Sequence, residues 1–219
     1  EEEMKKLQSS FKNMAIVLTA VTVIAGALLG YVNDLTKGPI ADANAKALSD
    51  AIAVVVPGFD NQPTENPETI EVNGASYTIY KATKGGEFIG AAVRSTSNGF
   101  GGPLTILVGF DADGNIIDYS LLSHAETPGL GSKADIWFKK DGKGSVIGMN
   151  PGKNPLSVSK DGGNIDAITA STITSRAFLA AVNNAYQAYA NGDSADVTTG
   201  ATSKPSQTEE VDNSINQAN

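Results

Sequence analysis

The sequence predicts an α+β fold, in which an antiparallel sheet is closed by a C-terminal helix and an N-terminal transmembrane helix precedes the domain. Three observations support this prediction. An uncharged, apolar run lies near the N-terminus, at residues 14–32. Short runs with strand-like alternation, separated by turn sequences, follow at residues 69–122, and an amphipathic helical pattern occupies residues 175–190. The 219 residues suffice for one ordinary domain with an appendage.

Composition and charge argue against several classes of function. The chain has 24 acidic and 16 basic residues and a net charge of −8, whereas a nucleic-acid-binding protein needs a concentrated basic face. The absence of cysteine excludes disulfides, thiolate zinc sites, protein-ligated Fe–S clusters and cysteine nucleophiles. The single histidine, His124, argues against a histidine metal site and a Ser-His-Asp triad. We therefore expect no nucleic-acid partner, no metal site and no catalytic residue.

Residues 14–32 predict the first element, a membrane-spanning helix. At a rise of about 1.5 Å per residue this run is about 28 Å long, close to the hydrocarbon thickness of a bilayer. A buried core helix and a cleaved signal peptide are the alternatives. The apolar region of a signal peptide is usually shorter, although the small-x-small sequence Ala41-Asp42-Ala43 leaves cleavage open. Because the run contains no acid or base, we expect it to anchor the protein and not to conduct an ion.

The charges beside this helix predict its orientation. Lys5, Lys6 and Lys12 precede it, whereas Asp34 and the single Lys37 follow soon after it. The positive-inside rule then places the N-terminus in the cytoplasm and the domain outside. The expected localisation is the cytoplasmic (inner) membrane, crossed once, with an extracytoplasmic domain.

Beyond the membrane the pattern predicts a helix, five strands and a last helix. Residues 38–56 have Pro39 early and apolar residues at helical spacing, and Pro57-Gly58 ends this helix. The last helix, Ser175–Ala190, has its large apolar residues along one stripe. The five expected strands, separated by glycine-containing turns, are Thr69–Val72, Tyr77–Ala82, Phe88–Arg94, Leu104–Phe110 and Ile116–Leu122.

The remaining C-terminal residues are almost entirely small or polar, and such a segment cannot bury enough surface to offset its ordering entropy. We expect it to be disordered. The chain therefore divides into a cytoplasmic N-terminus (1–13), a transmembrane helix (14–32), a helical linker (33–68), an extracytoplasmic domain (69–190) and a disordered acidic tail (191–219).

Two segments are candidates for a ligand site, and the first is the loop at residues 121–131, directly after the last predicted strand. Its Pro-Gly-x-Gly sequence makes a tight turn that brings backbone N–H groups close to a ligand. Glu126 and Thr127 offer polar side chains beside that turn. An ordinary surface loop is the alternative, because neither a dinucleotide-binding nor a P-loop glycine pattern is present.

The second candidate is the hydroxyl-rich segment at residues 166–176, which runs into the last helix. Helix N-capping explains Thr172, Thr174 and Ser175 individually. The alternative is a phosphate site, favoured by the free N–H groups and the positive dipole end of the helix. Arg176 in the first turn opposes that dipole, so a nearby anion would account for its presence.

Together, the two segments resemble a known family. The order of anchor helix, strands, Glu-Thr-Pro-Gly-Leu-Gly at 126–131 and D-x-x-[ST]-[GA]-[AS]-[ST]-x-T at 166–174 is similar to the FMN-binding domain of the RnfG-type protein of the Rnf electron-transport complex. Its homologue in the Na⁺-translocating NADH:quinone reductase, the C subunit, has the same pattern. The resemblance runs from about Lys5 to Tyr189. It includes the sequences Gly99-Phe100-Gly101-Gly102-Pro103 and Asp111-Ala112-Asp113-Gly114.

The resemblance implies FMN bound covalently to Thr174 through a phosphoester, which a dedicated flavin transferase installs. The family usually has Ser-Gly-Ala where this chain has Thr169-Ala170-Ser171, and losing the glycine would strain a backbone that needs positive φ. The other residues of the implied cofactor site are Asp166, Thr169, Ala170, Ser171 and Thr172 in the second segment, and Glu126, Thr127, Gly129, Leu130 and Gly131 in the first.

The resemblance also implies an electron-carrying subunit of an ion-translocating ferredoxin:NAD⁺ oxidoreductase, which exchanges electrons with flavin and Fe–S subunits and moves Na⁺ or H⁺. The short connections between strands favour the Rnf type over the quinone-reductase type. Two further hypotheses stay open. One is a membrane-anchored flavin-binding sensor or assembly protein without a catalytic role. The other is a membrane-anchored binding domain without a cofactor.

Three further features have both a functional and a simpler interpretation. His124 contacts the flavin or is a surface-loop residue, and Trp137 stacks on the flavin or belongs to the core. Residues 196–204 match the second motif up to the last position, where Lys204 replaces the acceptor threonine. No apolar helix follows this match, so we interpret it as a chance occurrence.

Overall fold

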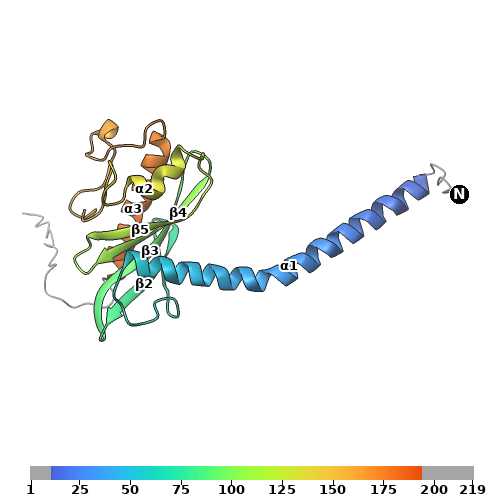
Figure 1. Cartoon of the computed structure of the whole chain (residues 1–219), viewed down its shortest axis with the longest axis horizontal. Coiled ribbons are helices and arrows are strands. Elements are labelled where there is room, and N and C mark those ends of the chain that lie inside the picture. Colours follow the sequence, from blue (N-terminus) through green and yellow to red (C-terminus); the bar gives the residue numbers. More distant parts are fainter. Residues whose placement is uncertain (1–10, 194–219) are drawn as a thin grey trace, which may run out of the picture.

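The computed structural model describes residues 11–193 and has the predicted order of elements (Figure 1). The segment before residue 11, the tail from residue 194 and the second motif match at 196–204 lie outside the described residues. Residues 191–193, expected in the tail, are helical. The elements are α1 (Phe11–Val55), β1 (Glu68–Val72), β2 (Ala75–Lys84), β3 (Glu87–Asn98), β4 (Pro103–Asp111), β5 (Ile116–His124), the 3₁₀ helix η1 (Gly131–Lys133), α2 (Ala134–Trp137), the 3₁₀ helix η2 (Ser159–Asp161) and α3 (Thr172–Asp193).

The five strands form one antiparallel sheet in which every strand pairs with its sequence neighbours, in the order β1-β2-β3-β4-β5. All five predicted strands are present, and β2 to β5 are longer than expected. The turn between β1 and β2 is made by Asn73 and Gly74, with φ of 53° and 77°. Positive φ at both central residues is what a two-residue hairpin requires, and Asn-Gly is its most favoured sequence.

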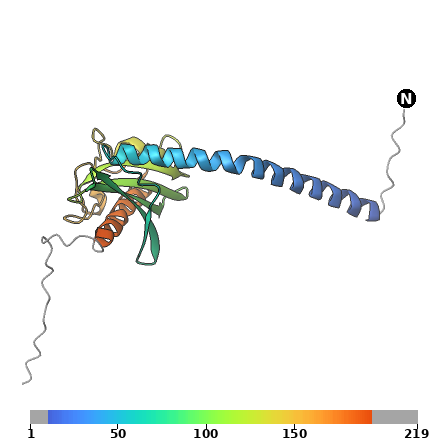
Figure 2. The same ribbon diagram turned by 90° about the horizontal axis from the view of Figure 1, so that it is seen from below.

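Helices cover both faces of the sheet (Figure 2). Because successive strand residues point to opposite faces, Ile106 and Val108 of β4 pack in the cluster that contains α3, whereas Leu107 packs in the cluster that contains the end of α1. Phe178 of α3 is fully buried in the first cluster, and Ile52 of α1 is fully buried in the second. This double coverage explains why β4 is a nearly continuous apolar run.

The helix α1 is continuous, whereas the sequence predicted a transmembrane helix and a separate second helix. Pro39 lies inside α1 and does not end it. Proline removes one helical hydrogen bond and crowds the preceding turn, so it kinks a helix or breaks it. Here α1 bends along its length (Figures 1 and 2). Residues 37–47 are exposed, and the helix is free to bend because it is not packed against the domain there. The expected helical linker is therefore helical to Val55 and irregular from there to β1.

The apolar N-terminal part of α1 is not a core helix of the domain. Its length and composition suffice to cross a membrane, and none of its most apolar window is buried. The alternative of a buried core helix is therefore wrong. The exposed large apolar side chains of this segment are Met14, Ile16, Val17, Leu18, Val21, Val23, Ile24, Leu28, Leu29, Tyr31 and Val32.

Candidate functional site

The two candidate segments meet in the structure. The Thr174 hydroxyl donates a hydrogen bond of 2.6 Å to Glu126 Oε2, across a separation of 48 residues. Both side chains are buried, with exposed fractions of 1% for Thr174 and 5% for Glu126. Thr174 therefore neither caps α3 nor faces open solvent.

The loop that carries Glu126 is shaped by its own hydrogen bonds. It leaves β5 at His124, whose Nδ1 accepts a hydrogen bond of 3.2 Å from the Glu126 backbone N–H. The Gly129 N–H then donates to Ser132 Oγ at 2.9 Å, and η1 and α2 follow. His124 is the exposed last residue of β5, and through this bond it shapes the loop that follows.

The approach to α3 is fixed by Ser175. Its hydroxyl accepts a hydrogen bond of 2.9 Å from the Ile168 N–H and donates one of 3.0 Å to the Ser171 carbonyl. These bonds hold the chain before α3 against the first turn of the helix. The side chain of Thr174, the residue before Ser175, points toward the loop after β5.

Two glycines make room for the Glu126 carboxylate. A Cβ at Gly99, in the β3–β4 turn, would lie 1.9 Å from Glu126 Oε1. A Cβ at Gly131 would lie 2.5 Å from Glu126 Oε2 and 2.7 Å from Thr174 Oγ1. The Gly101 N–H also donates to Glu126 Oε1, at 3.3 Å. The carboxylate is thus enclosed by three segments that are distant in sequence.

A cleft of ≈ 400 Å³ opens beside this pair. Phe100 and Ile173 line it, and the sequence did not predict either as a site residue. Both side chains are exposed. Phe100 lies in the glycine-rich β3–β4 turn, and that glycine-rich sequence could have indicated Phe100 as a site residue. The predicted residues that line the cleft are Glu126, Thr127, Leu130, Gly131, Ala170, Ser171, Thr172 and Thr174.

Three predicted site residues lie outside the cleft lining. Gly129 and Thr169 are exposed on the loops that flank it. The Asp166 carboxylate accepts a hydrogen bond of 3.3 Å from Ser159 Oγ, and the Asp166 carbonyl accepts one of 2.8 Å from the Trp137 indole N–H. Asp166 therefore holds its segment against neighbouring parts of the fold.

The tight turn before α3 has a strained residue. Ala170 adopts a φ of 61°, in the left-handed region that favours glycine. This is the position at which the resembling family usually has glycine, and the expected backbone restriction is therefore present. Because Ala170 lines the cleft, the strain lies in the wall of the candidate site.

The anion that accounts for Arg176 is a protein carboxylate. Arg176 Nε and Nη2 donate to the two carboxylate oxygens of Asp161, at 2.7 and 2.6 Å. This bidentate contact holds the pKa of Asp161 below its usual value, mainly through the hydrogen bond from Arg176. A nearby anion therefore does account for Arg176, and no bound phosphate is needed to explain it.

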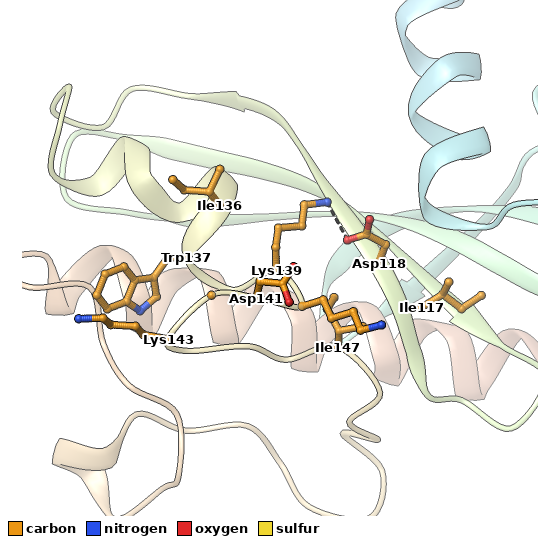
Figure 3. A pocket seen from close by; sticks show the side chains of 10 residues that line it. Ile117, Asp118, Ile136, Trp137, Lys139, Asp141, Lys143 and Ile147 are labelled. Atoms are coloured by element: carbon orange, nitrogen blue, oxygen red, sulfur yellow. Dashed lines mark hydrogen bonds and ion pairs between the residues drawn. The ribbon is translucent and has the colours of Figure 1, made fainter.

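Trp137 lies in a different, larger cavity of ≈ 600 Å³ (Figure 3). It is partly buried against the main core, as the simpler interpretation predicted. Lys139, in the same cavity, donates to Asp118 at 2.7 Å. None of the predicted cofactor-site residues lines this cavity, so its size alone does not make it the candidate site.

Comparison with known proteins gives one family and a set of similar relatives. A family model described as an FMN-binding domain matches residues 99–187. This range includes all three segments that enclose the Glu126 carboxylate.

The similar relatives carry consistent names. The G subunit of the ion-translocating oxidoreductase complex of Cereibacter sphaeroides (strain ATCC 17029) is 33% identical over 175 residues, which cover 77% of this chain and 79% of that protein. The protein of the same name from Yersinia pestis is 34% identical over 188 residues, covering 80% and 88%. The G subunit of the Na⁺-translocating ferredoxin:NAD⁺ oxidoreductase complex of Acetobacterium woodii is 30% identical over 209 residues, covering 87% and 98%.

Proposed function

This chain belongs to the family of G subunits of Rnf-type ion-translocating oxidoreductase complexes, and we propose that it carries electrons through FMN attached to Thr174 by a phosphoester. It is a membrane-associated redox subunit with an FMN-binding domain in a multi-subunit translocase. The covalent link is the part that we infer. The observation that supports it best is the Thr174 hydroxyl itself, which lines the cleft and is hydrogen-bonded to a buried carboxylate.

The size and the apolar lining of the cleft suit the flavin ring of FMN. The volume of ≈ 400 Å³ lies within the range of small-molecule sites, about 300–1,000 Å³. Phe100, Leu130 and Ile173 are exposed apolar side chains in its lining, and such side chains suit a flat aromatic ring.

The phosphate end of FMN fits the start of α3. The first turn of a helix has N–H groups without intrahelical acceptors, and these favour an anion. Lys160 Nζ lies 3.4 Å from Thr172 Oγ1, so the positive charge of the Lys160 ammonium lies beside the first turn of α3. Lys160 is a residue that the sequence did not single out.

Each part of the chain has a separate task in this proposal. FMN supplies redox chemistry in one- and two-electron steps when it is bound. The ester at Thr174 keeps the cofactor in place through repeated cycles, and the cleft orients it. The apolar part of α1 holds the domain at the membrane.

The partners follow from the family and from the sequence. The chain has no cysteine to ligate an Fe–S cluster of its own. The resemblance to the Rnf family implies that electrons come from and go to flavin and Fe–S subunits around it. The complex would couple ferredoxin oxidation and NAD⁺ reduction to ion movement, and a flavin transferase would attach the FMN. The lysines before the apolar part of α1 support a cytoplasmic N-terminus and an extracytoplasmic domain.

The test is to purify the chain from its native host and separate it on a denaturing gel. We expect flavin fluorescence that survives denaturation and a peptide whose added mass maps to Thr174. Thr174→Val should abolish both, whereas the control Thr64→Val, at an exposed loop position outside the cleft, should retain them. Thermal unfolding of each variant checks that it is folded. An unmodified wild-type chain would refute the covalent link.

A further inference from the structure

We propose that Glu126 is a catalytic residue for the modification of this chain, in which it accepts the proton of the Thr174 hydroxyl as the phosphoester forms. The inference rests on the proposed attachment of FMN at Thr174. The flavin donor must be a phosphoric anhydride of FMN, such as a flavin dinucleotide, because an ester forms from an anhydride without a further energy source. The transferase brings this donor, and the chain itself brings the nucleophile and the base.

The geometry suits proton transfer. Thr174 Oγ1 and Glu126 Oε2 are 2.6 Å apart, within the range for a general base and the proton that it removes. A hydroxyl is a weak nucleophile until an adjacent base takes its proton. The hydroxyl and the carboxylate therefore stand as a nucleophile and its base before any flavin is present.

The contacts of the Glu126 carboxylate are hydrogen bonds and not an ion pair. None of the ion pairs among residues 11–193 includes Glu126. Its carboxylate has two hydrogen-bond donors, the Thr174 hydroxyl and the Gly101 N–H. A buried carboxylate without a cation is costly for folding, so stability does not explain its presence.

Gly99 and Gly131 leave the space that the Glu126 carboxylate fills. Side chains at Gly99 or Gly131 would occupy the positions of the two carboxylate oxygens. The fold thus reserves a closely fitted space for this one side chain, next to the hydroxyl that is to react.

The step balances without any oxidation or reduction. Thr174 Oγ1 attacks the phosphorus on the FMN side of the anhydride, and a new O–P bond forms. The bond from that phosphorus to the bridging oxygen breaks, and its electron pair leaves with the nucleoside monophosphate. The proton of the hydroxyl moves to Glu126 Oε2.

The same proton transfer removes a charge conflict from the product. A phosphodiester at Thr174 carries one negative charge, and an ionised Glu126 beside it would repel that charge. Once protonated, Glu126 is neutral and can donate a hydrogen bond to an ester oxygen. The ionised Glu126 can therefore accept the hydrogen bond of the free Thr174 hydroxyl, and the protonated Glu126 can donate one to the ester.

The test measures the rate of covalent flavin incorporation into the full chain. The chain in detergent is mixed with its host's purified flavin transferase and flavin adenine dinucleotide, and the mass of the intact chain is followed over time. Glu126→Gln keeps the size and can still accept the Thr174 hydrogen bond through its amide oxygen, but it takes up no proton, so we expect incorporation to slow by about 100-fold or more. Glu126→Asp, which keeps a carboxylate, should react faster than Glu126→Gln.

Chemical rescue separates a base from a structural support. Glu126→Ala leaves a space between Gly99 and Gly131, and formate added to this variant should restore incorporation in proportion to its concentration. Equal rates for wild type and Glu126→Gln would overturn the proposal. A slow Glu126→Gln variant with no effect of formate, and with Glu126→Asp equally slow, would overturn it as well, because Glu126 would then only position Thr174.

The outcomes also separate this inference from the proposed function. A wild-type chain that gains no flavin mass, or gains it elsewhere than at Thr174, refutes the covalent attachment itself. A wild-type chain modified at Thr174 together with an unaffected Glu126→Gln variant refutes only the role of Glu126. Circular dichroism of each variant confirms that it is folded, and the formate experiment still decides if Glu126→Gln is not.

Discussion

Thr174 Oγ1 and Glu126 Oε2 are joined by a buried hydrogen bond of 2.6 Å that connects the first turn of α3 to the loop after β5. β5 lies at one edge of the sheet, and α3 covers one of its faces. The bond therefore links two parts of the fold that strand pairing does not connect. Changes that separate the two oxygens should disturb the cleft and the stability of the domain together.

Gly131→Ala is expected to separate them. The new Cβ would lie 2.5 Å from Glu126 Oε2 and 2.7 Å from Thr174 Oγ1, so one of the two side chains must move. Overpacking of this kind costs about 1–3 kcal/mol in the free energy of unfolding. Urea denaturation measures that cost, and covalent flavin incorporation should fall at the same time.

Gly148→Ala is the matched control outside the candidate site. The φ of 79° at Gly148 makes alanine unfavourable there, by about 1 kcal/mol, but nothing lies within 4 Å of the added Cβ. The variant should lose stability and still incorporate flavin at the wild-type rate. If both variants lose incorporation equally, general loss of stability explains the effect and the crowding of the Glu126–Thr174 pair does not.

Ala170→Gly should stabilise the domain by about 1 kcal/mol. Ala170 has a φ of 61°, and the left-handed conformation costs a residue with a Cβ more than it costs glycine. Thermal or urea unfolding measures the gain. Ala180→Gly, on the exposed side of α3, is the control, because glycine inside a helix loses about 1 kcal/mol. Destabilisation by both substitutions would mean that Ala170 does not have this φ in solution.

The sheet and the last helix were predictable because their signals are local. Alternating apolar residues and glycine turns predict strands, and a hairpin sequence such as Asn73-Gly74 predicts which strands are neighbours. The position of the end of α1 on the second face of the sheet was not predictable in this way. That contact depends on the fit between Ile52 and residues such as Leu107, which lie far apart in sequence.

The candidate site was predictable as two motifs and not as a geometry. The sequence indicated Glu126 and Thr174 separately, and only the fold brings them into contact. The partner of Arg176 could not be predicted from the motifs, because the Asp161 carboxylate lies in η2, outside both of them. Asp166 shows the reverse case, a motif residue whose contacts lie away from the cleft.

Ile52→Ala should destabilise the domain by about 2–5 kcal/mol. Ile52 is fully buried between α1 and the sheet, and a truncated side chain leaves a cavity there. Val54→Ala is the control on the same turn, because Val54 is 56% exposed and a surface substitution changes stability by about 0.5 kcal/mol or less. Urea denaturation of both variants compares the two costs. Equal small effects would show that the end of α1 does not pack on the sheet.

The ion pair between Arg176 and Asp161 predicts a pH dependence on the acid side. The hydrogen bond from Arg176 lowers the pKa of Asp161 in the folded chain, and this partner is absent in the unfolded chain. The folded state therefore gains stability at pH values above the ordinary aspartate pKa. That gain is lost as the pH falls through the lowered value. Both side chains are exposed enough for salt to weaken the effect.

Titration of the Asp161 carboxyl by NMR measures this shift directly. In Arg176→Gln the pKa of Asp161 should return toward its ordinary value, and the stability difference from wild type should shrink at acid pH. An unchanged Asp161 pKa in this variant would show that the pair does not form in solution. Flavin incorporation should be unaffected, because Arg176 is matched by a protein carboxylate and is not needed by a phosphate. Loss of incorporation in Arg176→Gln would instead place Arg176 on the phosphate side of the cofactor.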